Sequence, residues 1–195
     1  MIRAALLFGG RSAEHEVSIL SARSVAKAAS DRVEFVPIFM TKDGKFTDPE
    51  ASASVLSGGP APSPASEFSF ESWIREASLD IVFPLIHGTG GEDGALQGYL
   101  ETLGVPYVGS GVTASAVGMD KHHMKQAFAA AKLPLVDYVA LTEPEWKNER
   151  ERVTRSVVNA MRLPSSETSK RSTSYERCDV RNVRWPVARS IRARR

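Results

Sequence analysis

Apolar runs alternate with amphipathic segments over most of the chain. Residues 3–8, 33–40 and 80–86 are rich in apolar, β-branched and aromatic side chains, which predicts three buried strands. A shorter run at residues 105–108 predicts a fourth strand. Because helical segments separate these runs, the pattern indicates an α/β fold built on a parallel sheet.

The segments between the strands show helical spacing. From Glu14 onward, apolar and small side chains recur at steps of three and four residues, which predicts a helix with one apolar stripe. This stripe consists of Val17, Leu20, Ser24, Val25 and Ala28. Further helices are predicted at residues 70–77 and in a segment that runs to about Lys132. Another is predicted from an apolar stripe that Gly104 closes as a C-terminal cap, namely Leu96, Tyr99, Leu100 and Leu103.

Glycine-rich turns follow three of the predicted strands, at residues 9–10, 88–94 and 109–111. The carboxyl ends of parallel strands meet at one edge of a sheet, and α/β folds bind ligands at that edge. We therefore expect a ligand site there. Neither of the first two turns shows G-x-G-x-x-G leading directly into a helix, and the sequence contains no Walker A pattern. A standard nicotinamide or P-loop site is therefore not indicated.

The composition is that of an ordinary globular protein. Of the 195 residues, 42% are hydrophobic and 25% are charged, and no run approaches the roughly 20 apolar residues of a membrane span. The chain reaches strand-like sequence at once, with no signal peptide, so a cytoplasmic location is expected. The single cysteine, Cys178, excludes an intramolecular disulfide framework and argues against a thiolate metal site.

The net charge of +2 conceals an uneven distribution along the chain. Residues 1–150 carry 13 Lys and Arg against 19 Asp and Glu, a net charge of −6. Residues 151–195 carry 12 against 4, a net charge of +8. A basic segment of this kind can bind nucleic acid or a membrane surface, and the alternative is a stretch that does not belong to the folded domain.

Ionisable side chains near the turns are candidates for chemistry, and each also has an ordinary explanation. Glu14 could bind a substrate ammonium or orient a hydroxyl, or it could complement the dipole of a helix capped by Ser12. His87 could bond a substrate carboxylate or hold a loop. Lys121, with Lys125 one helical turn later, could hold a phosphate or belong to a solvated helix face.

Two adjacent acids, Glu92 and Asp93, lie in the second turn. Their carboxylates could bind a cation. However, two acids followed by a glycine are more typical of a turn and a helix N-cap.

Four segments, in order, resemble the signatures of D-alanine–D-alanine ligases. Residues 9–18 read GGRSAEHEVS and resemble the N-terminal signature, and residues 87–98 read HGTGGEDGALQG and resemble the second. Residues 107–116, YVGSGVTASA, and 119–121, MDK, resemble the segment that follows in the family. The resemblance covers roughly residues 3–142, and four ordered motifs are far more specific than one glycine-rich turn.

The resemblance implies a Rossmann-like (pre-ATP-grasp) parallel-sheet domain at residues 1–115, followed by the beginning of an ATP-grasp central domain at residues 116–163. It also implies an ATP-driven reaction. One D-alanine carboxylate would be phosphorylated, and the amino group of a second D-alanine would attack the acyl phosphate. The products would be ADP, phosphate and D-alanyl-D-alanine, which enters peptidoglycan precursors.

The same resemblance implies roles for individual residues. Glu14 would be the catalytic residue that binds the ammonium of the first D-alanine, Ser18 and His87 would line the substrate pocket, and Lys121 would contact the ATP phosphates. These roles suit the side chains, because a carboxylate pairs with an ammonium and a lysine pairs with phosphate. ATP and Mg²⁺ are implied as cofactors, with no metal ligand expected in this chain. Members of the family are usually homodimers.

Residues 164–195 show no sustained helical or strand period and are crowded with Arg and Ser. Family members continue at this point with an apolar strand and a phosphate-binding loop. We therefore interpret the basic tail as out-of-frame translation or another truncation product, expect it to be unstructured, and do not expect a nucleic-acid partner. A truncated ligase should be inactive alone. The alternative function is a non-catalytic α/β module for small-molecule binding or dimerisation.

Overall fold

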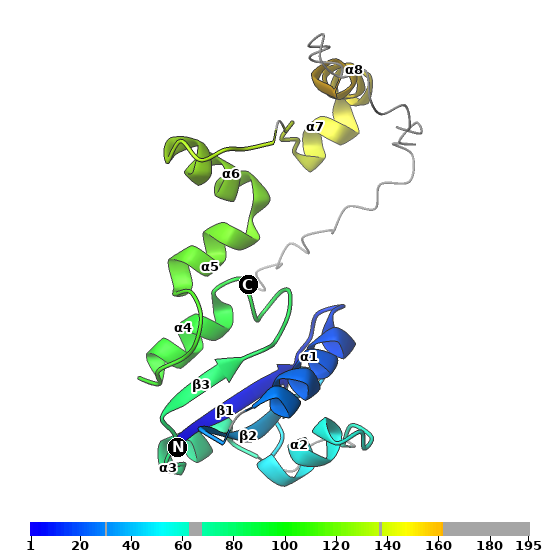
Figure 1. Ribbon diagram of the computed structural model, residues 1–195. Helices are drawn as coiled ribbons and strands as arrows, with labels where there is room; N and C mark the ends of the chain where they lie inside the picture. The colour runs from blue at the N-terminus through cyan, green and yellow to red at the C-terminus, as the bar shows by residue number, and fades with distance from the viewer. Residues whose placement is uncertain (30, 63–67, 137, 162–195) are drawn as a thin grey trace, which may run out of the picture. The chain divides into compact units, whose positions relative to one another are not determined.

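The computed structural model divides into two compact units, Met1–Leu135 and Val136–Arg195 (Figure 1). It describes residues 1–29, 31–62, 68–136 and 138–161. The domain boundary predicted at residue 115 falls inside the first unit and stays a prediction. The basic tail predicted at residues 164–195 lies outside the described residues.

Three parallel strands form the sheet of the first unit, in the order β2-β1-β3. They are β1 (Ile2–Gly9), β2 (Val33–Met40) and β3 (Ile81–Pro84). The last six residues of β1 are all buried, because a central strand covered on both faces has no solvated side. The predicted α/β fold with a parallel sheet is confirmed.

The fourth predicted strand, residues 105–108, is reduced to one parallel bridge between Val82 and Tyr107. Val82 donates to the carbonyl of Pro106 at 2.8 Å, and Val108 donates to the carbonyl of Val82 at 2.9 Å. Pro106 has no N–H, which limits the ladder that this segment can form.

One face of the sheet is covered by α1 (His15–Ala28) and α2 (Pro49–Leu56). The buried cluster on this face consists of Leu6, Phe8, Ile19, Ala22, Phe39 and Val55. The sequence analysis did not predict α2, although Asp48 and Pro49 carry a standard start signal. Asp48 caps the helix by accepting the N–H of Ala51 at 2.9 Å, and Pro49 occupies its first turn.

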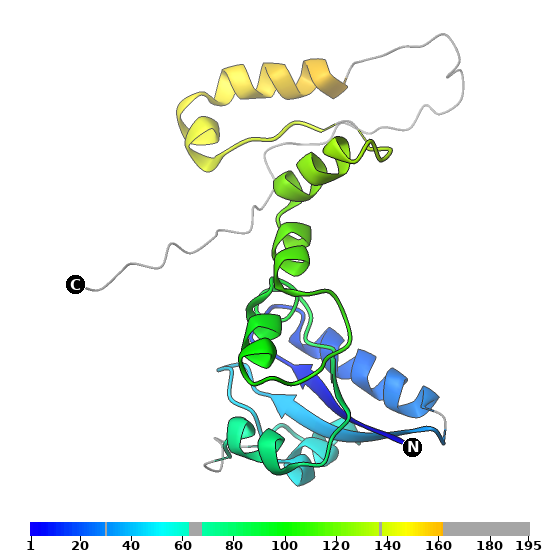
Figure 2. The ribbon, with the colours of Figure 1, turned by 90° about the vertical axis from the view of Figure 1, so that its left-hand side faces the viewer.

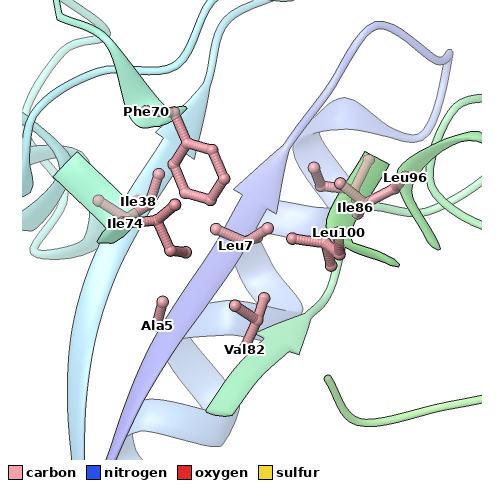
Figure 3. Packing of buried hydrophobic residues seen from close by; sticks show 9 residues of the cluster. All are labelled: Ala5, Leu7, Ile38, Phe70, Ile74, Val82, Ile86, Leu96 and Leu100. Carbon is pink, nitrogen blue, oxygen red and sulfur yellow. The ribbon is translucent and has the colours of Figure 1, made fainter. Parts of the chain in front are cut away.

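The opposite face is covered by α3 (Phe70–Glu76) and α4 (Ala95–Thr102), so that α1 and α4 lie on opposite sides of the sheet (Figure 2). Figure 3 shows the buried cluster that the sheet forms with α3 and α4: Ala5, Leu7, Ile38, Phe70, Ile74, Val82, Ile86, Leu96 and Leu100. Residues 5 and 7 point to this face and residues 6 and 8 to the other, as strand geometry requires. The sheet therefore has two cores, one on each face.

The apolar stripe predicted for α1 is not the face that the sheet buries most, although Val25 of that stripe packs against the cluster. Val17 and Leu20 are 52% and 59% exposed, whereas His15, Ser18, Ile19 and Ala22 are buried. Hydrogen bonds explain the difference, because they allow polar side chains to be buried. The hydroxyl of Ser18 bonds two backbone groups, and Nδ1 of His15 donates to the carbonyl of Gly10 at 2.6 Å.

The predicted helix that ends near Lys132 is divided in two, α5 (Val112–Met119) and α6 (Lys121–Ala130). Asp120 between them has an extended backbone and caps α6, accepting the N–H groups of His122 and His123 at 2.9 and 3.0 Å. The His123 N–H holds the pKa of the Asp120 carboxyl below its ordinary value. An N-cap aspartate thus ends one helix and starts the next.

The second unit contributes α7 (Glu143–Asn148) and α8 (Arg150–Met161). Thr142 and Glu145 form a capping box at the start of α7, and Arg150 lies over the ring of Trp146 at 5.0 Å. Among the helices of the described chain, none is both long and apolar enough to span a membrane.

Candidate functional site

The turn after β1 is fastened to the segment after β3 by one buried hydroxyl. Gly9 donates its N–H to Ser18 Oγ at 2.8 Å, and Ser18 Oγ donates to the carbonyl of Leu85 at 2.5 Å. Ser18 is fully buried. Gly9 has φ +93°, and a side chain there would lie 2.2 Å from the carbonyl oxygen of Met40. Ser18 therefore holds the carboxyl ends of two strands in register, beneath the surface of the turn.

Glu14 occupies the N-cap position of α1, which one interpretation of the sequence gave to Ser12. Its backbone N–H donates to Ser12 Oγ at 3.1 Å, and Ser12 Oγ donates to the carbonyl of His87 at 2.7 Å. The side chain of Glu14 is exposed, and Oε2 lies against the backbone of Gly88. Within the described part of the chain, the carboxylate oxygens of Glu14 form no hydrogen bond and no ion pair.

His87 is hydrogen-bonded through one ring nitrogen and lies near a carboxylate on its other side. Nε2 lies 2.9 Å from Ser21 Oγ, and Nδ1 lies 3.6 Å from Glu92 Oε1. Its side chain is 26% exposed, so part of the ring remains accessible to a ligand. The sequence analysis did not identify Ser21. Its spacing of three residues from Ser18 on one helix face was the available signal.

The two acids of the second turn serve the turn itself. Glu92 Oε2 accepts the N–H of Gly88 at 3.0 Å, and Asp93 accepts the N–H groups of Gly90 and Ala95 at 2.9 and 3.1 Å. The turn interpretation of these acids is therefore confirmed. No three His, Cys, Asp or Glu side chains gather into a possible metal site within the ranges that the structure describes.

Lys121 and His87 both line one cavity of about 510 Å³, which Glu14 does not line. Lys121 is the first residue of α6, and its Nζ lies 3.5 Å from the carbonyl of Gly118. A larger cavity of about 700 Å³ lies along α1 and α2 and contains none of the four predicted site residues. The structure thus places the Glu14 carboxylate beside Gly88, whereas His87 and Lys121 line a common cavity.

Gln97 is a further polar residue at the turn that the sequence analysis missed. It is buried, with 7% of its surface exposed, and it lines the same cavity as His87. Nε2 donates to the carbonyl of Gly91 at 2.9 Å, whereas Oε1 has no partner among the described atoms. Its position between Leu96 and Leu100 on the buried face of α4 was the signal.

Comparison with known proteins identifies the family. Residues 3–110 match the model of the D-ala D-ala ligase N-terminus family. A D-alanine–D-alanine ligase from Halothermothrix orenii is 45% identical over 145 residues, covering 70% of this chain and 41% of the relative. A D-alanine–D-alanine ligase from Bacillus licheniformis is 40% identical over 176 residues, covering 83% of this chain and 49% of the relative.

Solved structures agree with the sequence relatives. The D-alanine–D-alanine ligase from Coxiella burnetii superimposes with a TM-score of 0.61 and 31% identity, covering 80% of this chain and 50% of that one. A D-Ala:D-Ser ligase from Enterococcus faecalis gives 0.58 and 27%, with 80% and 49% covered. The chain thus spans about half the length of the curated relatives it matches. Since the family model covers more than half of the chain, the protein belongs to the D-alanine–D-alanine ligase family, in which it matches the N-terminal region.

Proposed function

We propose that this chain supplies the half of a D-alanine–D-alanine ligase that binds the first D-alanine. In the proposed reaction, the γ-phosphoryl group of ATP passes to the carboxylate of this D-alanine, which leaves ADP. The amino group of a second D-alanine then attacks the acyl phosphate, and phosphate leaves as the peptide bond forms. The match to the family and the position of Glu14 support this proposal.

The Glu14 carboxylate is the single observation that carries the proposal. It lies at the carboxyl edge of the sheet against the Gly88 backbone, exposed, and no side chain among the described residues neutralises it. An unpaired carboxylate of this kind can accept charge-assisted hydrogen bonds from a substrate ammonium. Glu14 would thus orient the D-alanine whose carboxylate reacts.

We propose distinct roles for the other candidates. Ser18 would act from beneath the turn, because its hydroxyl is fully buried and joins the two strand ends. His87 would present its accessible ring edge to the substrate pocket, with its orientation held by the hydrogen bond to Ser21. Lys121 would contact the ATP phosphates from the start of α6, since the only bond of its ammonium within the described residues is a long one, to the Gly118 carbonyl.

The family implies ATP and Mg²⁺. The described residues of this chain offer a partner for the ATP phosphates but no ligand for Mg²⁺. Lys121 suits phosphate, because an ammonium pairs with a phosphate oxygen. Mg²⁺ prefers carboxylate oxygens and water, but Glu92 and Asp93 are engaged by backbone N–H groups of the turn. We therefore assign no described residue to the metal. Bound Mg²⁺ would neutralise charge on the transferring phosphate.

Self-association is part of the proposal. Val17 and Leu20 leave exposed apolar surface on α1, and a second copy of the chain could cover it. Light scattering of the purified chain measures this directly. A dimer that Leu20→Glu converts to a monomer would support association through α1, whereas a wild-type monomer would contradict it.

The test of the ligase proposal joins residues 1–161 of this chain to the complementary half of the Bacillus licheniformis relative. We expect this fusion to release phosphate from ATP in a D-alanine-dependent manner. Glu14→Gln should lower kcat/KM at least about tenfold, because a charge-assisted hydrogen bond contributes about 1.5–3 kcal/mol.

Glu16→Gln is the matched control. Glu16 lies two residues away on α1, and its carboxylate pairs with Lys42 at 3.0 Å instead of facing Gly88. Its replacement should leave the kinetics of the fusion unchanged. Equal losses in the two variants, or full activity in Glu14→Gln, would refute the role assigned to Glu14.

A further inference from the structure

Two segments far apart in the sequence build the surroundings of Glu14. Ser12 Oγ donates to the carbonyl of His87, 75 residues away, and accepts the backbone N–H of Glu14. One hydroxyl thus joins the start of α1 to the turn after β3. The next residue of that turn, Gly88, is buried against this junction.

Gly88 leaves a space that the Glu14 carboxylate occupies. A Cβ atom on Gly88 would lie 2.7 Å from Glu14 Oε2 and 3.1 Å from both Cβ and Oγ of Ser12. These separations are shorter than ordinary van der Waals contact, so any side chain at this position displaces the carboxylate. The backbone of Gly88 is itself fixed, because its N–H donates to Glu92 Oε2 at 3.0 Å.

We propose that Ser12 and Gly88 are positioning residues for Glu14: Ser12 fixes its backbone, and Gly88 provides the space in which its carboxylate lies. The inference rests on the proposed function, because the position of Glu14 matters for catalysis only if Glu14 binds the substrate. Neither residue touches the substrate in this account. Each acts through Glu14.

Backbone conformation alone is the competing explanation for glycine at residue 88. Gly88 has φ +71°, in the left-handed region that glycine favours. The same turn contains an internal control. Gly90 has φ +89°, but a Cβ atom there would meet nothing within 4 Å. Alanine at either position imposes left-handed strain, and only alanine at residue 88 meets the Glu14 carboxylate.

The experiment compares D-alanine binding by the wild-type chain, Gly88→Ala and Gly90→Ala. Binding is followed by NMR in ¹⁵N-labelled protein, with L-alanine as the stereochemical control, and melting temperature is recorded for each variant. We expect Gly88→Ala to weaken D-alanine binding about tenfold or more relative to Gly90→Ala, at similar melting temperatures. Equal weakening in the two variants, or none in Gly88→Ala, would overturn the proposal.

A second measurement separates this inference from the proposed function. The ¹³C chemical shift of the Glu14 carboxyl carbon reports its surroundings without any ligand. Gly88→Ala should move this resonance, and Gly90→Ala should leave it in place. If wild-type protein fails to bind D-alanine while the resonance moves as stated, the proposed function fails and the positioning geometry stands. An unmoved resonance in Gly88→Ala would overturn the positioning geometry itself.

The role of Ser12 has its own comparison. Ser12→Ala removes the donor to the His87 carbonyl and the acceptor for the Glu14 N–H, and Ser12→Thr restores a hydroxyl. Ser24→Ala removes a hydroxyl whose one bond among the described residues stays within α1, to the carbonyl of Leu20 at 3.0 Å. We expect weaker D-alanine binding and a shifted Glu14 resonance in Ser12→Ala, recovery in Ser12→Thr, and no change in Ser24→Ala. Wild-type behaviour of Ser12→Ala in both readouts would remove Ser12 from the proposal.

Discussion

At the carboxyl edge of the sheet, serine hydroxyl groups hold the start of α1 against the segment that follows β3. Ser12, Ser18 and Ser21 each bond a group in the chain segment that follows β3. The resemblance to the family drew attention to Ser18. The hydrophobic pattern did not predict its burial, because a serine does not contribute to an apolar stripe. Its burial is stabilised by two backbone partners that lie 9 and 67 residues away.

Replacing Ser18 tests this account at the scale of one residue. Ser18→Ala leaves the Gly9 N–H and the Leu85 carbonyl without their partner, so the free energy of unfolding should fall by about 1–3 kcal/mol. Urea denaturation followed by circular dichroism measures the change. Ser24→Ala, on the exposed face of the same helix, should stay within about 0.5 kcal/mol of wild type. Similar effects of the two substitutions would contradict the structural role of Ser18.

At the scale of elements, the sequence located most helices and strands but not the orientation of α1. Helical periodicity identified a helix from Glu14 onward, as observed, yet it favoured the face that contains Val17 and Leu20. The other face is buried because Ile19 and Ala22 pack on the sheet. Ser18 lies between them and satisfies its hydroxyl through backbone bonds.

Two alanine substitutions on adjacent residues distinguish these faces. Ile19→Ala removes a side chain that is 8% exposed, which should destabilise the protein by about 2–5 kcal/mol. Leu20→Ala removes one that is 59% exposed in the single chain, and its effect, measured at a concentration where the chain is monomeric, should lie within about 0.5 kcal/mol. Urea titration of both variants provides the measurement. A larger loss in Leu20→Ala would mean that the periodic stripe is buried after all.

At the scale of the whole molecule, both hydrophobic clusters belong to the first compact unit. All residues of the two clusters, and the hydrophobic residues packed against them, lie between Ala5 and Tyr107 in the sequence. The sheet, with α1 and α2 on one face and α3 and α4 on the other, is thus complete within Met1–Leu135. Its stability should therefore depend little on the remainder of the chain.

A fragment of residues 1–135 tests this expectation. We expect it to unfold cooperatively in urea, with the same midpoint as the full chain within experimental error, because it retains both clusters. Loss of the cooperative transition, or a clearly lower midpoint, would show that residues beyond 135 stabilise the core.

The sequence by itself determined the three strands, the glycine-rich turns after β1 and β3, and the family, because these follow from local apolar runs and ordered motifs. Glu14 could likewise be singled out from its motif. Only the tertiary structure decided which face of α1 is buried, that Asp120 divides a predicted single helix, and that Gly88 adjoins the Glu14 carboxylate. The hydrogen bonds that hold the start of α1 against the segment after β3 join residues more than sixty positions apart in the sequence. They depend on how β1 and β3 pair, and hydrophobic periodicity carries no information on which hydrogen-bond partners that pairing brings together.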